Sequence, residues 1–587
     1  MRNFWYVRIF ESVIRALAAR GHSIHILAEH DPDPVPQWTA AAMALAGDCP
    51  NVTIGYARRS IDDEWLDLRV MVRLGRDYLR FLRPQYASTP ILAKRARARV
   101  PAAIAGLAER GVMTRTTMEA ALRMAERAIP EDPEIAAAVA AERPDVVLVT
   151  PLLDLGSDQH DVVRTARRLG VPTALCVGSW DHLSSKALIR EAPDRVFVWN
   201  ATQKREAVDL HRVPGDRVVV TGAQCFDQWF DRPPALAREE FCRKVGLDPS
   251  KPHILYVCSA LFEGSPNEAE FVATWIAAVR ASHDPALRNA GILVRPHPKR
   301  GFEWDNVDLA ALPNVSLWPP HASAPMDSVT KSDYFDSMYH SASVVGVNTS
   351  ALIEAGIVGR RVHTILIPEF NENQEGTLHF RYLIDGGLLR VARDMNAHVT
   401  QLEESLRGFR TDEHPNRSFI ESFVRPRGLN VAATPAFVEA VEQLAELEPA
   451  RVRAPLWVPA LRKALAPLAR RTLGTFAEHE SRERRYRDKQ RARAERMAGL
   501  EVQRAAEKAR IVEERRLRRE VARRERQAGA ERDSAARLAT KQQEREVKEQ
   551  RKAGRMTQWQ REKRRHAINA RLVAYCRRLI KPFSASR

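Results

Sequence analysis

Three small polar residues, Asn348, Thr349 and Ser350, directly follow the apolar run Val344–Val347 and open a predicted helix that contains Glu354. Backbone N–H groups and hydroxyls at a helix N-terminus favour an anion, and phosphate above all. Glu354 lies four residues after Ser350, on the same helix face, where its carboxylate could accept hydrogen bonds from ribose hydroxyls. The alternative is plain N-capping, but a capping box places its Glu three residues after the cap, not four. We therefore favour a site for the phosphates and ribose of a nucleotide.

A basic loop with the sequence Arg-Pro-His-Pro-Lys-Arg occupies residues 295–300, after the apolar run Gly291–Arg295. The two prolines hold the backbone extended on both sides of His297. Arg295, His297 and Lys299 concentrate positive charge at the end of a predicted strand, which suits a diphosphate. A proline-stiffened loop with solvated charges is the alternative, and the presence of the first group favours the phosphate interpretation.

The third group is Ser-Trp-Asp-His at 179–182, after the apolar run Thr173–Val177. Asp181 and His182 could supply a general base from another part of the chain. Alternatively, Asp181 caps the following helix and the tryptophan packs between domains, and we weigh base and cap equally. Weaker candidates for contacts to the same nucleotide also follow apolar runs: Arg295, Ser259, Gln374, Thr377 and His379.

Other kinds of site are not indicated. The sequence contains no P-loop, dinucleotide fingerprint, zinc-protease motif or nucleophile elbow. The six cysteines are scattered without a CxxC pair, which favours a reducing compartment over disulfides or structural zinc. No metal and no cofactor are therefore expected. No apolar run is long enough to span a membrane, and the first residues do not resemble a signal peptide.

The elements that must position these groups alternate between short apolar runs and helical stretches. Continuous rather than alternating apolar runs predict strands covered on both faces, as in parallel sheets. Two sets of five predict an α/β fold with two doubly wound, Rossmann-like domains, in which ligands bind beyond the carboxyl ends of the strands. The predicted strands are Ile24–Leu27, Val146–Thr150, Thr173–Val177, Arg195–Trp199 and Val218–Thr221, then Ile254–Cys258, Gly291–Arg295, Val315–Trp318, Val344–Val347 and Val362–Ile367.

The first domain, 1–232, departs from this scheme at two places. Residues 61–142 are rich in Ala, Arg and Leu and predict an all-helical excursion. A first helix is predicted at Phe10–Leu17, yet no strand comes before it, although such a domain normally begins with a central strand. We expect either a start further upstream or a domain without its first strand. A strand formed by residues 1–7 would contradict this. The proline pair after Arg232 marks the boundary to a second domain, 233–448.

The charge is divided unevenly along the chain of 587 residues, whose net charge is +18. Residues 1–450 hold 51 Lys and Arg against 57 Asp and Glu, whereas residues 451–587 hold 41 against 17. The body is therefore slightly acidic, which excludes nucleic-acid binding by the whole protein.

The basic tail divides into two segments. Residues 449–477 carry an apolar stripe with Trp457 among Arg and Lys, which suits either an anionic membrane surface or packing on the body, with equal weight. Residues 478–587 are rich in Arg and Glu, and their pairs three and four apart predict a long solvated helix. The apolar positions do not keep a heptad, so a coiled coil is weakly supported. A spacer with an anionic-surface contact is the favoured interpretation, and nucleic acid is the rival.

The RPHP loop and the NTSALIEAG helix start, each in the second of two doubly wound domains, resemble the GT-B superfamily. Bacterial surface-polysaccharide glycosyltransferases, CDP-glycerol glycerophosphotransferases and non-hydrolysing UDP-N-acetylglucosamine 2-epimerases are the related groups. The resemblance covers about residues 1–445. It is weakest for the epimerases, because their Gly-Gly pair and double glutamate in the phosphate helix are missing here.

The resemblance implies two facing domains, with the donor held by the second. Thr349 and Ser350 would bind the donor phosphates, Glu354 the ribose and His297 a phosphate. The loop at Asp181 and His182 occupies the place of a catalytic histidine in the glycerophosphotransferases and of a catalytic glutamate in the epimerases, with Asp181 slightly favoured as the base. The His-Pro pair also resembles transferases that use CMP-activated sugars, so the donor nucleotide stays open.

The sequence thus predicts a cytoplasmic glycosyltransferase, peripheral on the inner face of the plasma membrane through its tail. It would move a glycosyl group from a nucleotide-activated donor to a hydroxyl of a saccharide or lipid-linked acceptor in cell-surface polysaccharide synthesis. The alternatives are a CDP-glycerol-type glycerophosphotransferase and a non-catalytic scaffold with a membrane-binding tail. Nucleic acid is an unlikely partner.

Overall fold

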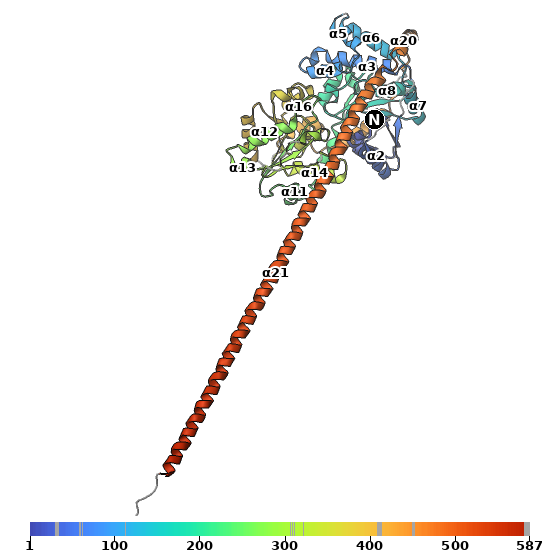
Figure 1. Ribbon diagram of the computed structural model, residues 1–587. Helices are drawn as coiled ribbons and strands as arrows, with labels where there is room; N and C mark the ends of the chain where they lie inside the picture. The colour runs from blue at the N-terminus through green and yellow to red at the C-terminus, as the bar shows by residue number, and fades with distance from the viewer. Residues whose placement is uncertain are drawn as a thin grey trace, which may run out of the picture. The chain divides into compact units, whose positions relative to one another are not determined.

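The computed structural model describes residues 1–29, 35–57, 60, 63–111, 113–305, 307, 309, 312–320, 322–407, 414–448 and 452–579, with side chains left out along part of the last helix. The chain divides into two compact units, Met1–Tyr486 and Arg487–Arg587. The first unit contains two lobes of parallel strands and helices (Figure 1). The predicted fold class, two Rossmann-like α/β domains followed by a charged helical tail, is confirmed.

The second lobe is built on one complete parallel sheet. Its strands lie in the order β12-β11-β10-β7-β8-β9, so the first strand in the chain is central and the order reverses there, as in doubly wound folds. Every residue of β7 is buried, which explains the continuous apolar sequence of that strand. The strands are β7 (His253–Val257), β8 (Gly291–Arg295), β9 (Val315–Leu317), β10 (Ser343–Val345), β11 (Arg361–Ile365) and β12 (Leu389–Ala392).

The first lobe has its strands in two separate sheets. β1 pairs with β2, and a second sheet has the order β3-β4-β5-β6. Residues 1–7 form no strand of either sheet, because Phe4–Tyr6 is a short 3-10 helix and α1 begins at Val7. The strands are β1 (Ile24–Glu29), β2 (Val52–Ala57), β3 (Val147–Val149), β4 (Thr173–Cys176), β5 (Arg195–Val198) and β6 (Val218–Val220).

Both lobes contain helices as well as strands, and those of the first lobe include the predicted helical excursion, α3 to α7. The helices are α1 (Val7–Ala19), α2 (Pro36–Asp48), α3 (Leu66–Phe81), α4 (Pro90–Arg97), α5 (Ala102–Glu109), α6 (Arg115–Ala128), α7 (Pro133–Glu142), α8 (Gln159–Leu169), α9 (His182–Ser185), α10 (Ala201–Asp209), α11 (Arg238–Val245), α12 (Glu268–Arg280), α13 (Pro285–Arg288), α14 (Ser328–Tyr339), α15 (Ala351–Ile357), α16 (Leu378–Asp385), α17 (Met395–Arg407), α18 (Arg417–Phe419), α19 (Ala433–Ala445), α20 (Val458–Thr472) and α21 (Thr475–Leu579).

The chain returns from the second lobe to the first through α19. Phe437 of this helix packs against Phe10 of α1, with ring centroids 5.9 Å apart, and joins the core that α1 forms with β1 and β4. Asp227, near the end of the first lobe, accepts hydrogen bonds from the N–H groups of Ala433 and Thr434. The last helix of the predicted segment 233–448 is thus part of the first lobe's core.

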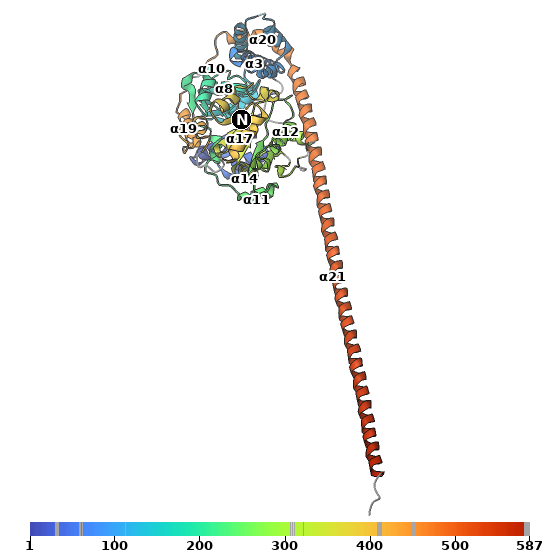
Figure 2. The same ribbon diagram turned by 90° about the vertical axis from the view of Figure 1, so that its left-hand side faces the viewer.

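The apolar stripe of α20 faces the body. This helix packs beside α3 and α6 (Figure 1 and Figure 2). Ala469 is fully buried, and Leu465 packs against the cluster that Trp65 and Ile129 form with their neighbours. Of the two interpretations of 449–477, packing on the body therefore describes the stripe, although Leu456 and Leu468 stay exposed. Contact of the tail with an anionic surface stays a prediction.

The second unit consists of a single long helix in its described part. α21 begins within the first unit at Thr475 and continues to Leu579, which confirms the predicted helical tail. Where its side chains are described, the apolar ones, such as Leu517, Leu538 and Trp559, are exposed. Within the described residues, no helix combines the length and the apolar character needed to cross a membrane.

Candidate functional site

The basic loop after β8 presents two groups outward. Lys299 is exposed and His297 is half-buried, and the backbone N–H of Lys299 donates to Nδ1 of His297 at 3.2 Å. Burial, together with the charges of Lys299, Arg300 and Arg8, lowers the pKa of His297 to about 4. The imidazole is thus neutral at neutral pH, first because it is partly buried and second because it lies among cations, a setting that favours an anion.

Arg295, also predicted to contact the donor, points inward instead. Its guanidinium donates to Oγ of Ser337 at 2.7 Å and lies 5.1 Å from the ring centroid of Tyr334. The hydroxyl of Tyr334 in turn donates to Oε2 of Glu354 at 2.5 Å. Burial raises the pKa of Glu354 to about 7, against the opposing effects of Tyr334 and Arg8. Arg295 therefore supports the tyrosine that orients Glu354.

Residues 348–350 lie at the carboxyl end of β10, as predicted. The N–H of Asn348 donates to Oγ of Ser259 at 3.0 Å, and its side chain donates to the backbone oxygen of Asn373. Oγ1 of Thr349 is 3.4 Å from the N–H of Ala351, a long contact. Ser350 is exposed, and its side chain makes no capping hydrogen bond. The hydroxyl of Ser350 is thus free for a ligand, whereas the hydrogen bonds of Asn348 stabilise the loop.

Asp181 follows β4 in the first lobe and lies at the start of α9. Its carboxylate accepts hydrogen bonds from Oγ of Ser179 at 2.5 Å and of Ser185 at 3.1 Å, and Nζ of Lys186 is 3.7 Å away. Burial opposes ionisation, but Lys186 and the neighbouring imidazoles outweigh it, so the pKa of Asp181 falls below its usual range. Asp181 is therefore ionised and well satisfied.

His182 is buried beside Asp181, with its ring 6.4 Å from that of Tyr6. Among the described residues, its Nδ1 has no hydrogen-bond partner. Burial lowers the pKa of His182 below 6.5, and the Asp181 carboxylate acts against that shift. A neutral imidazole with an unused nitrogen next to a carboxylate is a suitable proton acceptor, since the carboxylate would stabilise the imidazolium.

The two lobes bring these groups together. Neighbouring protein atoms partly desolvate the ammonium of Lys299 and lower its pKa, although the residue reaches the surface, and the charges of Lys186 and Asp181 from the first lobe also act on this pKa. Arg8 of α1 likewise acts on both His297 and Glu354 across the lobes. We call this set the interlobe site: Arg8, Asp181, His182, Lys186, His297, Lys299, Ser350 and Glu354.

The weaker candidates for donor contacts lie at the margin of the interlobe site or beneath it. His379 packs edge-to-face against Trp180, with centroids 4.7 Å apart, and its Nε2 is 3.5 Å from Asn348. Gln374 is fully buried and donates to the backbone oxygen of Ile365 at 2.9 Å, and the buried hydroxyl of Thr377 donates to the oxygen of Gln374. Ser259 is buried as well and bonded to Glu268. These three shape the loops and do not present polar atoms outward.

Sequence reasoning missed the cations of the first lobe, Arg8 and Lys186. Arg8 lies in the first turn of α1 with its guanidinium 4.6 Å from the ring centroid of Trp5, and Lys186 ends α9. A signal was present for Lys186, which is five residues from Asp181 on the same predicted loop. Arg8 carried none, because its neighbours in the sequence suggest only an amphipathic helix.

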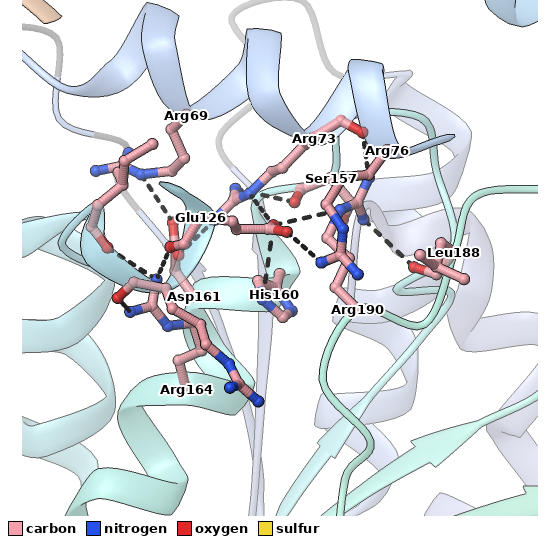
Figure 3. A network of polar contacts seen from close by, with 12 residues as sticks. Arg69, Arg73, Arg76, Glu126, Ser157, His160, Asp161, Arg164, Leu188 and Arg190 are labelled. Atoms are coloured by element: carbon pink, nitrogen blue, oxygen red, sulfur yellow. Dashed lines mark hydrogen bonds and ion pairs between the residues drawn. The ribbon is translucent and has the colours of Figure 1, made fainter. Parts of the chain in front are cut away.

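A buried row of arginines on α3 holds the loop of Asp181 from beneath. Arg80 donates to the backbone oxygens of Leu183 at 2.5 Å and of Ala187 at 2.7 Å. Oδ1 of Asp77 accepts from the N–H of Leu188 at 2.9 Å. Figure 3 shows how Arg69, Arg73 and Arg76, from the same helix, reach the carboxylates of Glu126 and Asp161. This network fixes the backbone that carries His182 and Lys186.

Within the part of the chain that the structure describes, no three His, Cys, Asp or Glu side chains gather as ligands of a metal ion. The interlobe site instead combines three basic side chains, two histidines and two carboxylates from both lobes.

Comparison with known proteins gives no match to a family model and no match to a curated protein. Among solved structures, the UDP-GlcNAc 2-epimerase from Neisseria meningitidis bound to UDP-GlcNAc is 13% identical, with 72% of this chain and 99% of that one covered and a TM-score of 0.39. A glycosyltransferase from Rickettsia africae ESF-5 is 11% identical, with 75% and 94% covered and a TM-score of 0.41. The wall teichoic acid polymerase TagF is 14% identical, with 43% and 59% covered and a TM-score of 0.28. At these identities and TM-scores the matches do not assign the chain to a family.

Proposed function

We propose that the protein is a transferase that moves a glycosyl group from a nucleotide-activated donor to an acceptor hydroxyl. The observation that carries the proposal is the convergence of Lys299 and His297 from one lobe with Lys186 and Arg8 from the other, around Asp181 and His182. Cations fixed before the reaction stabilise a departing diphosphate without reorganisation. A neutral imidazole beside a carboxylate can accept the proton of an attacking hydroxyl.

The donor would lie against the second lobe. Lys299 and the Ser350 hydroxyl would bind the phosphates, and His297 would gain a proton or a hydrogen bond next to them because an anion raises its pKa. Glu354, oriented by Tyr334, would accept from a ribose hydroxyl. Arg8 and Lys186 would complete the anion site from the first lobe, so that both lobes hold one substrate.

In the transfer step, the acceptor oxygen forms a bond to the anomeric carbon while the bond from that carbon to the phosphate oxygen breaks. The hydroxyl proton passes to His182, and the electron pair of the broken bond leaves with the nucleotide. Asp181 stabilises the imidazolium, while Lys299, Lys186 and Arg8 offset the charge that develops on the diphosphate. For a glycerophosphate donor the same groups would act on phosphorus, and the donor screen below distinguishes the two.

The nucleotide is tested by thermal shift and calorimetry with UDP, CDP and GDP and their activated sugars or polyols. Lys299→Ala is expected to lower the affinity for the preferred diphosphate about 10–100-fold, since it removes a charge-assisted hydrogen bond. Arg8→Ala is expected to act in the same direction from the opposite lobe. Binding should also weaken with added salt, and less steeply in both variants.

Lys251→Ala provides the matched control, because Lys251 is half-buried like a typical surface lysine, pairs with Asp248 at 3.6 Å and lies before β7, at the opposite end of the second sheet. Its affinity should equal that of the unmodified protein. If Lys299→Ala bound the preferred diphosphate as tightly as the unmodified protein, the proposed anion site would be wrong. Absence of any nucleotide binding would favour the scaffold alternative. Preference for CDP-glycerol would favour the glycerophosphotransferase.

A further inference from the structure

A large slot separates β1 from β3 in the first lobe. Its volume is about 1080 Å³, which corresponds to roughly 35 water molecules. Close-packed interiors leave few voids larger than one water, so a slot of this size inside a lobe is unusual. Its walls are mainly apolar and come from three helices, with Phe10 and Ile14 on α1, Phe437 and Val441 on α19, and Val139 on α7.

The two strands that border the slot each pair on one side only within the described residues: β1 with β2, and β3 with β4. The N–H of Ile24 donates to Asn51 beside β2, and that of Val147 donates to Pro172 beside β4. Because alternate residues of a parallel strand point to opposite neighbours, the backbone groups of His25, Leu27 and Leu148 point into the slot. Both edges of the slot are thus rows of hydrogen-bonding groups.

Met1 and Arg2 already occupy the end of this slot with the bonding pattern of a parallel strand. The amino group of Met1 donates to the oxygen of Leu27 at 2.6 Å, and the oxygen of Met1 accepts from the N–H of Glu29 at 3.1 Å. On the other side, the N–H of Arg2 donates to the oxygen of Thr150 at 3.2 Å. Consecutive residues that bond to left and right define the direction and the register of a strand between β1 and β3.

The second lobe shows what fills the equivalent position. There β8 and β10 flank the central strand β7, as β1 and β3 flank the slot. β7 is five residues long and fully buried. In the doubly wound order, the first strand of a lobe is central and leads into the first helix, which in the first lobe is α1.

We propose that the slot binds one apolar β-strand of about five residues, parallel to β1 and β3 and joined to Met1 by a peptide bond. The residue directly before Met1 donates to Leu148 and accepts from Thr150, and the residue before that donates to His25 and accepts from Leu27. Side chains of the strand point alternately toward α1 with α19 and toward α7, so both sets are apolar. The filled slot fixes α1, and with it Arg8, whatever reaction the interlobe site performs.

The test adds Met-Lys-Val-Ile-Val-Phe before Met1 in the full chain. The melting temperature is expected to rise by about 5 °C or more, because apolar surface becomes buried and two strand edges become paired. Hydrogen exchange of the Leu27 and Thr150 amides should slow on the order of 100-fold. The control extension Met-Lys-Val-Ile-Pro-Phe lacks the N–H that would donate to His25 and should give neither effect.

A second variant checks the slot itself. Ala138 of α7 lines the slot. In the extended chain, Ala138→Trp should cancel the rise in melting temperature, because the indole occupies the space of the added strand. In the chain without the extension, the same substitution should leave the melting temperature unchanged. Equal melting temperatures for the apolar and the proline extensions would overturn the proposal. So would full protection of the Leu27 and Thr150 amides before any extension is added.

Discussion

His182→Gln is expected to lower kcat/KM for the transfer reaction by about 10²–10⁴-fold, the range typical of a lost general base. Glutamine matches the size of the imidazole but cannot accept the proton. Because burial holds the pKa of His182 below 6.5, protonation of His182 should limit activity only as the pH falls through that lowered pKa, below any loss of donor affinity from protonation of Glu354, whose pKa is about 7. The measurement is the pH profile of kcat/KM with the donor found by binding.

The variant Asp181→Asn distinguishes the role of Asp181 in proton transfer from that of His182. The carboxylate raises the pKa of His182, so its removal should shift the acid limb of the profile to lower pH, with a smaller loss of activity than in His182→Gln. If Asp181 were itself the base, the order of the losses would be reversed. The profile of the unmodified enzyme would then stay flat through pH 5, because Asp181 remains ionised there.

The buried strands could be predicted because burial on both faces requires an apolar residue at nearly every position. β7 and β8 are buried at all five positions, so their apolar runs are continuous and the prediction of a parallel sheet is confirmed. β2 and β12 were missed for the opposite reason. Each lies at the edge of its sheet, and exposed residues such as Thr53 and Arg390 interrupt the apolar pattern.

The site was predicted only as far as it lies at strand ends. His297, Ser350 and Asp181 each lie in the loop after the carboxyl end of a strand, and a general rule of parallel sheets places ligands there. Whether a polar residue in such a loop points outward depends on its partners, which the sequence does not show. Gln374 turned inward because the backbone oxygen of Ile365 accepts from its amide. Arg8 depends on how two lobes meet, which no local pattern encodes.

The arginines of α3 have an environment that the sequence analysis did not predict. Residues 69, 73, 76 and 80 have helical spacing, and a row of arginines on one helix face normally indicates a solvated surface. Here the row is buried, because carboxylates from α6 and α8 meet it in the interior (Figure 3). Asp161 pairs with Arg69 and Arg73, and Glu126 pairs with Arg73 and Arg76. Nothing in the sequence distinguishes either carboxylate.

Arg73→Met is therefore expected to destabilise the protein by about 3–5 kcal/mol, although methionine fits the space and is apolar. The guanidinium lies 2.5 Å from Oδ1 of Asp161, 3.1 Å from Asp158 and 3.4 Å from Glu126, and it is fully buried. Its removal leaves the charge of Asp161 in the interior with fewer partners, which costs more than the intact pair gains. Chemical denaturation with a two-state fit of the first transition measures the change in the free energy of unfolding.

Arg97→Ala is the matched control, since Arg97 pairs with Glu109 in an equally short contact at the surface. It should leave unfolding unchanged, because water replaces the lost partner. The network also predicts a pH dependence. Its arginines and His160 hold the pKa of buried Glu126 well below 4.5 despite desolvation, so this stabilisation is present above pH 4.5 and is lost as the pH falls through the lowered pKa. Equal losses from Arg73→Met and Arg97→Ala would mean that water reaches the α3 row, and the loop of His182 would then lack the rigid support on which its role depends.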